Sequence, residues 1–277
     1  MKSLKYLLLA LPLALLGACS ADEGSEPGTN PVPTVTLFHY TPDAEKGLNP
    51  DNDVTVRFAT NSATTAVYYK VDLEEDMKAY ISSNGTAAYM QKIIEEGEKI
   101  EVNGADNIDK DVTGIKGACV LVAVATNGGS HSMDSFSFFG LDWTSIVPGY
   151  IQYNIQGLPH GQNCELQKCT NVEDLYRIKD AFPAGMSMKF TVTDKKGTNE
   201  NGNFTLVRVP ENESPWSTSS GPVYVGDIAT WKADDNLAFT QYPSFMYEDY
   251  FCEFALAWYV SPTAYVGMNY AYFVPQE

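Results

Sequence analysis

Residues 117–139, GACVLVAVATNGGSHSMDSFSFF, carry the clearest strand signal in the chain. A run rich in Val and Ala leads into Asn127-Gly128, a pair that favours a tight turn. Ser and Phe then alternate, and a period of two places successive side chains on opposite faces of a strand. The stretch therefore predicts two strands in succession, joined by a turn.

The same period recurs along most of the chain after residue 33. In DVTVRFAT, residues 53–60, Val54, Val56 and Phe58 share one face of a strand. Such alternation is typical of half-buried antiparallel strands. Further strands are expected at residues 34–40, 66–72, 149–157, 175–180, 186–194, 203–209, 222–228, 253–260 and 269–274.

Residues 74–100 break this pattern with helical spacing at Met90, Ile93 and Ile94 and a stop at Gly97, which predicts one or two short helices. A Pro-Gly pair at Pro148-Gly149 places a domain boundary near residues 143–149. We therefore expect a mainly β chain with two antiparallel β-sandwich-like domains, and a short helical insertion in the first. The domains cover residues 34–145 and 148–277.

Residues 34–145 resemble a fibronectin type III or immunoglobulin-like domain, because the strand, Asn-Gly turn and strand of 117–139 follow one another as in its last hairpin. Residues 148–277 resemble the carboxy-terminal β domain of uncharacterised Bacteroidota-type surface lipoproteins. That resemblance rests on LQKCTNVEDLYRIKDAF (166–182), FALAWYV (254–260) and AYFVP (271–275). It implies a place among glycan-capture machinery.

The N-terminus reads as a signal peptide over residues 1–18, with two lysines and an apolar run at residues 6–16. At ~1.5 Å per residue this run covers only about half of a ~30 Å hydrocarbon layer. The sequence Leu16-Gly17-Ala18-Cys19 resembles the lipobox of bacterial lipoproteins. The resemblance implies that Cys19 carries acyl chains such as palmitate and anchors the protein in outer-membrane lipid. A plain secretory signal is the alternative.

Residues 19–33 are polar and contain three prolines, so we expect a flexible tether. Its acids Asp22 and Glu23 resemble the export signal of Bacteroidota-type surface lipoproteins, which implies the exterior face of the outer membrane. An ordinary spacer on a periplasmic lipoprotein is the alternative.

A net charge of −17 disfavours binding to nucleic acid phosphates. No catalytic or nucleotide-binding motif is present, so we expect no enzyme and no cofactor. Glu248 and Asp249 are adjacent acids, and glycosidases use a pair of acids. Adjacent residues on a strand point to opposite faces, however, so nothing fixes the separation that glycosidase chemistry requires. A calcium loop around Asp43, Asp51 and Asp53 does not follow a known spacing, and no metal site is expected.

Four cysteines remain beyond Cys19, and they allow three pairings. Cys119 lies in a strand-like run and is most simply a buried free thiol. The pairing among Cys119, Cys164, Cys169 and Cys252 stays open.

Aromatic residues are dense near the C-terminus, where 13 of the 35 residues at 239–273 are Phe, Tyr or Trp. Most should pack in a core. Trp216 and Trp231 differ because polar, turn-forming residues surround them, and an exposed indole can stack on a sugar ring. They are the candidate ligand-binding residues. The alternative is that each indole folds back over its own loop.

These patterns predict a lipid-anchored surface protein that binds glycan without catalysis, or an accessory component of nutrient acquisition. Its expected partners are a polysaccharide, an outer-membrane transporter or other surface proteins. The alternative is a structural or adhesive surface protein that assembles through β-strand contacts.

We predict that Cys19→Ala abolishes lipid attachment, because Cys19 is the residue at the end of the apolar signal. Acyl-chain labelling of cells expressing each form measures this. Unchanged labelling of the variant would show that the lipoprotein interpretation is wrong.

Overall fold

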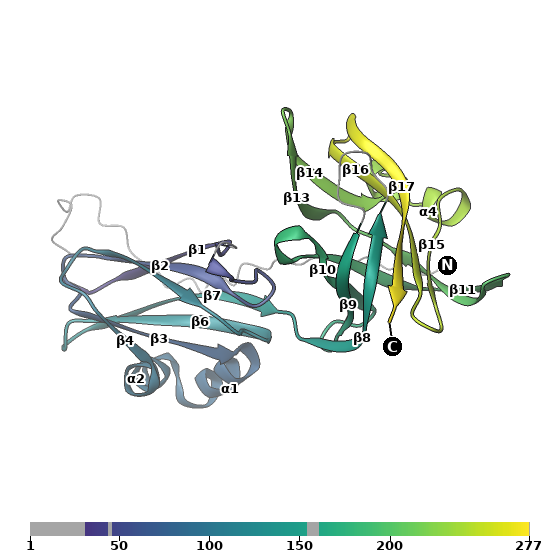
Figure 1. The fold of residues 1–277 in the computed structure, drawn as a ribbon. Helices are drawn as coiled ribbons and strands as arrows, with labels where there is room; N and C mark the ends of the chain where they lie inside the picture. Colours follow the sequence, from purple (N-terminus) through teal and green to yellow (C-terminus); the bar gives the residue numbers. More distant parts are fainter. Residues whose placement is uncertain (1–30, 44–45, 154–160, 277) are drawn as a thin grey trace.

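The computed structural model describes residues 31–43, 46–153 and 161–276. The signal segment and most of the tether, with Cys19, therefore lie outside the described residues. The chain is mainly β, and all its strand pairings in the described ranges are antiparallel, so the predicted fold class is confirmed at this level. It forms an N-terminal part and a C-terminal part that meet where β7 passes into β8 (Figure 1).

In its described residues the N-terminal part has two sheets and the α-helices α1 and α2. The three-stranded sheet has the order β1-β2-β5, with β1 at Val35–Tyr40, β2 at Val54–Thr60 and β5 at Asn107–Val112. The four-stranded sheet has the order β4-β3-β6-β7, with β4 at Glu98–Glu101, β3 at Ala66–Leu73, β6 at Gly117–Thr126 and β7 at His131–Gly140.

Strand β6 is buried on both faces, which explains why its sequence is apolar at almost every position. Leu121 and Ala123 pack into a core shared with the three-stranded sheet, whereas Val122 and Val124 pack against the helices. A strand covered on both faces has no position for a solvated side chain. The predicted hairpin is confirmed, since Thr126 pairs with His131 across the turn.

The predicted helical insertion is confirmed as two helices, α1 at Glu74–Asn84 and α2 at Thr86–Glu96. Helix α2 ends where the Gly97 N–H bonds the Ile93 carbonyl oxygen at 2.9 Å. A Cβ at Gly97 would meet the Tyr69 carbonyl oxygen at 2.8 Å, so a side chain does not fit there. Among the described residues, every helix is too short or too polar to cross a lipid bilayer.

The C-terminal part is a closed barrel, which corrects the predicted β-sandwich. Strand β17 pairs with β8 along one side and with β16 along the other, and this closes eight of the ten strands into a ring. Strands β13 and β14 extend from β16. Alternation shows which side chains face a core, but the pattern is the same whether or not the first and last strands pair.

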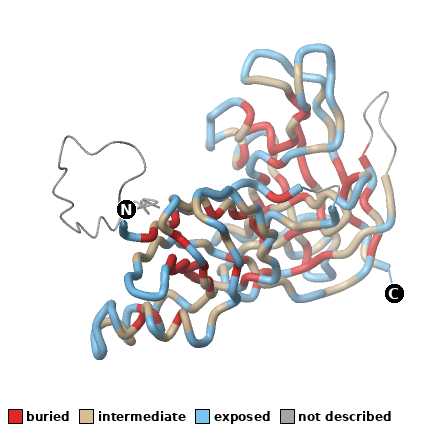
Figure 2. Tube along the Cα trace, turned by 90° about the vertical axis from the view of Figure 1, so that its left-hand side faces the viewer, coloured by how far each residue is buried: buried red, intermediate tan, exposed pale blue. Residues whose placement is uncertain are grey.

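The strands of the C-terminal part run in the sheet order β13-β14-β16-β15-β12-β11-β10-β9-β8-β17. Buried residues recur along these strands, and β16 is buried at almost every position (Figure 2). A short 3-10 helix at Pro183–Gly185 precedes β11, and α3 and α4 follow β14. The strands and α-helices of the C-terminal part are β8 Trp143–Tyr153, β9 Gly161–Cys169, β10 Leu175–Phe182, β11 Met186–Asn199, β12 Gly202–Arg208, β13 Asn212–Thr218, β14 Gly221–Asp227, α3 Ile228–Lys232, α4 Leu237–Thr240, β15 Ser244–Tyr247, β16 Cys252–Ser261 and β17 Ala264–Pro275.

A buried ionic cluster joins the two parts. Asp51, in the turn before β2, is 7% exposed, and its carboxylate accepts from Arg177 at 3.1 Å and from Lys189. The Arg177 guanidinium also lies 4.3 Å from the centre of the Trp143 ring and donates to Gln167 at 2.8 Å. Asp51, one of the acids of the calcium loop considered from the sequence, therefore has two cationic partners on the barrel.

Backbone contacts hold the same junction. The Leu141 N–H donates to the Asp51 carbonyl oxygen at 2.8 Å, and the Asn52 amide donates to the carbonyl oxygens of Ile115 and Leu141. The Thr170 N–H donates to the Asp142 carbonyl oxygen at 2.7 Å. The connection is thus braced on both sides of residues 140–143.

We predict that Asp51→Ala lowers the free energy of unfolding by about 3 to 5 kcal/mol, because Arg177 is left buried without its carboxylate. Urea unfolding followed by circular dichroism measures this. Asp109→Ala is the control, since it removes an exposed ion pair with Arg57 and should change stability little. Equal effects of the two substitutions would contradict the structural role of Asp51.

Candidate functional site

Trp231 does not present an open indole to solvent. It lies on α3 and is 6% exposed, and its Nε1–H donates to the Ser261 carbonyl oxygen at 3.2 Å. Its ring stacks on Tyr259 with centroids 6.3 Å apart. The polar neighbours in its sequence are explained by α3, whose Asp227 cap accepts from the Thr230 N–H at 2.6 Å while the helix turns the indole inward.

Trp216 lies on β13 and packs against the core of the barrel. Its half-buried ring meets the rings of Tyr153, Phe182 and Trp258 edge to face, with centroids 5.9, 5.6 and 5.4 Å away. Trp216 thus packs against the interior core, whereas Trp231 packs against the outer side of β16. The structure does not bring the two indoles together, and the premise that both are exposed in polar loops is wrong.

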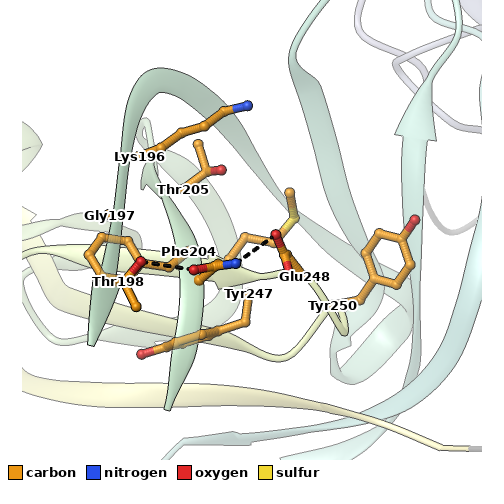
Figure 3. Close-up of a pocket in the computed structure, with 10 residues that line it drawn as sticks. Lys196, Gly197, Thr198, Phe204, Thr205, Tyr247, Glu248 and Tyr250 are labelled. Carbon is orange, nitrogen blue, oxygen red and sulfur yellow. Dashed lines mark hydrogen bonds between the residues drawn. The ribbon is translucent and has the colours of Figure 1, made fainter. Parts of the chain in front are cut away.

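A groove lies instead against the long hairpin of β11 and β12, and we call it the hairpin groove (Figure 3). Its volume is about 520 Å³. Strands β11, β12 and β15 and the turn after β15 supply its lining. The lining residues are Lys196, Gly197, Thr198, Asn203, Phe204, Thr205, Met246, Tyr247, Glu248 and Tyr250.

Strand register places the polar lining residues on one face of the hairpin. Lys196 pairs with Thr205, and Thr205 pairs with Met246 on β15. Two positions further out, Thr198 pairs with Asn203. Residues two apart on a strand share a face, so these rows point to the same side.

Hydrogen bonds order the outer row. The Thr198 hydroxyl donates to the Asn203 amide oxygen at 2.8 Å, and the Asn203 amide nitrogen donates to the Glu248 carboxylate at 3.1 Å (Figure 3). One amide hydrogen of Asn203 and one oxygen of Glu248 are left over by these two bonds. The row can therefore both donate to and accept from a ligand.

Tyr250 lines the groove and is 41% exposed. Its φ is +67°, a left-handed conformation that is unfavourable for a residue with a side chain. The turn holds it, because the Tyr250 N–H donates to the Tyr247 carbonyl oxygen at 3.0 Å and the Phe251 N–H donates to the Asp249 carboxylate at 3.0 Å. A strained turn thus presents an open aromatic ring.

Aromatic packing supports the hairpin beneath the polar rows. Phe204 and Tyr247 are directly paired, and their positions alternate with the polar ones. The Phe204 ring lies 4.6 Å from that of Phe245, and the Tyr247 hydroxyl accepts from the Asn199 amide at 3.0 Å. These contacts fix the strands that carry Asn203 and Glu248.

Sequence reasoning noted Glu248 only as one of two adjacent acids and missed the groove. The pairing of β11 with β12 is visible locally, through the turn sequence Asn199-Glu200-Asn201-Gly202. The pairing of β12 with β15 joins segments about 40 residues apart, and no local pattern reports it.

The described residues contain neither a disulfide bond nor a cluster of metal-ligating side chains. Cys119, Cys164, Cys169 and Cys252 are all free, so the buried free thiol expected at Cys119 is confirmed. Burial raises the pKa of the Cys164 thiol to about 12 and raises that of Cys252, which keeps both protonated near neutral pH. No group of three or more metal-ligating side chains occurs within the described residues.

We predict that Trp231→Ala lowers the free energy of unfolding by about 3 kcal/mol, because it leaves a cavity between α3 and β16. Thermal and urea unfolding measure this. Phe139→Ala removes a ring that is 49% exposed and should have little effect. Unchanged stability in Trp231→Ala would contradict the packing role.

In comparisons with protein-family models, with curated proteins and with solved structures, no match to this chain was found. The hairpin groove and the sequence patterns are therefore the features that bear on function.

Proposed function

We propose that the protein is a lipid-anchored surface protein that binds a glycan in the hairpin groove without catalysis. The observation that carries this proposal is the ordered row of Thr198, Asn203 and Glu248 beside the open ring of Tyr250. Amide and carboxylate groups bond sugar hydroxyls, and an aromatic ring covers the apolar face of a sugar ring.

The affinity for a single chain is expected to be weak. An aromatic contact is worth only about 0.5 to 1.5 kcal/mol beyond the buried area. A dissociation constant between high micromolar and millimolar corresponds to roughly −4 to −6 kcal/mol. Several copies anchored on one membrane raise the effective affinity for a long polysaccharide.

The membrane anchor and the family resemblance belong to the same proposal. Acylated Cys19 would hold the protein in the outer membrane, with Asp22 and Glu23 directing it to the exterior. Seven strands in sheets of three and four are also the count of an immunoglobulin-like or fibronectin type III sandwich, which supports that resemblance for the N-terminal part. An outer-membrane transporter would be the partner in glycan uptake.

We predict that Asn203→Ala weakens glycan binding about tenfold, because it removes bonds to the ligand and releases Glu248. Tyr250→Gly should also weaken binding, while it stabilises the fold by relieving the positive φ. Calorimetry with the detergent-solubilised full chain against a panel of polysaccharides measures binding.

Phe139→Ala is the control for this experiment, since it removes an exposed ring far along the chain from the groove and should bind as the parent does. The proposal is rejected if no polysaccharide binds the parent, or if folded Asn203→Ala and Tyr250→Gly bind as tightly as the parent.

A structural or adhesive role is the second candidate, and one observation favours it. The first half of β17 carries large apolar side chains that are 41% to 57% exposed, which is a feature of contact surfaces. They are Tyr265, Val266, Met268 and Tyr270. Self-association of a parent protein that binds no polysaccharide would favour this candidate.

A further inference from the structure

A carboxylate lies between two aromatic residues on the outer face of the barrel. Glu253 on β16 pairs with Phe245 on β15 and with Tyr272 on β17. Its neighbours Cys252 and Phe254 point into the core, so Glu253 points outward. Side chains at directly paired positions lie about 5 Å apart at Cβ, and we call these three residues the carboxylate row.

Glu253 has no partner of its own within the described ranges. It is half-buried, and none of the hydrogen bonds or ion pairs found there includes its carboxylate. Burial alone raises its pKa. An ionised carboxylate that is partly removed from water without a partner lowers the stability of the fold, and a cationic partner would offset this cost.

The rings beside Glu253 pack against other rings, but among the described residues neither carries a cation. Elsewhere this chain places its own cations on aromatic rings, as Arg177 on Trp143 and Lys232 on Trp231. Phe245 and Tyr272 take part in no such contact among the described residues. Phe251 stacks on Tyr272 with centroids 6.2 Å apart and thereby fixes its ring.

We propose that the carboxylate row is a docking site for a lysine or arginine side chain of a partner protein. The carboxylate pairs with the cationic head, and the flanking rings accept it through cation–π contact. The chain as a whole carries a net charge of −17, which favours the approach of a basic partner.

The surroundings of the row fit an opposed protein surface. Tyr270 and Val274, which share the outward face of β17, are 41% and 43% exposed and extend the row with apolar area. Glu253 lines neither the hairpin groove nor the second groove, which lies between α3, α4 and Met268. Neither Glu253 nor Tyr272 lines the hairpin groove, although Phe245 packs on Phe204 of that groove with ring centroids 4.6 Å apart.

The test uses Glu253→Gln, which keeps the shape of the side chain and removes its charge. The detergent-solubilised full chain is titrated with a lysine-rich peptide and with the same peptide acetylated on its lysines, which lose their charge. We expect the acetylated peptide to bind the parent at least about tenfold more weakly, and Glu253→Gln to weaken binding of the unmodified peptide by about the same factor. Glu75→Gln, on the exposed face of α1, removes the same net charge and should bind as the parent does.

Thermal unfolding gives the second readout. Because Glu253 lacks a partner, Glu253→Gln should raise the unfolding temperature while it lowers peptide binding. A lower unfolding temperature would identify Glu253 as a structural residue and overturn the proposal. So would equal peptide binding by Glu253→Gln and Glu75→Gln, which would indicate non-specific charge attraction. Glycan binding by both variants is measured separately, so failure of this site is distinguishable from failure of the hairpin groove.

Discussion

Strand β17 pairs with β16 on one side and with β8 on the other, and this double pairing closes the barrel. Closure gives every wall strand an inner and an outer face. Strands β12, β15, β16 and β17 lie side by side in this wall. Within the closed sheet, the pairing of β12 with β15 brings Glu248 near Asn203, and the pairings of β16 with β15 and β17 place Glu253 between Phe245 and Tyr272. Both proposed sites therefore depend on the same set of backbone pairings.

The barrel divides the aromatic residues into two populations. Phe254, Trp258 and Phe273 fill the interior and are fully buried. Residues one position away along the same strands, such as Tyr259 and Tyr272, face outward. Because the wall needs only its inner rings for core packing, the outer rings are left to support helices, the hairpin and contact surfaces. The high aromatic content near the C-terminus thus reflects two layers of rings, one inside the barrel and one on its outer face.

The ionic cluster at Asp51 shows how an acidic chain uses its few cations. With 18 lysines and arginines against 35 acids, most acids remain solvated. Arg177 and Lys189 are nonetheless committed to one aspartate of the N-terminal part, and Arg177 also covers Trp143. A buried pair of this kind specifies geometry more than it adds stability, so its role is to hold the barrel against the N-terminal part at a defined position.

Local patterns predicted many of the strands and the helical insertion, because a period of two or 3.6 involves only neighbours in the chain. They did not predict β4, β5, β9, β13 or β15. They also identified the buried thiol at Cys119. The tertiary structure alone decided that the C-terminal strands close into a barrel, since alternation is identical in a sandwich. It likewise decided the surroundings of single side chains: Trp231 is buried despite polar neighbours, and Asp51 and Glu248 acquire partners more than 40 residues away. Such contacts depend on the register between distant strands, and that register follows from packing of the whole core.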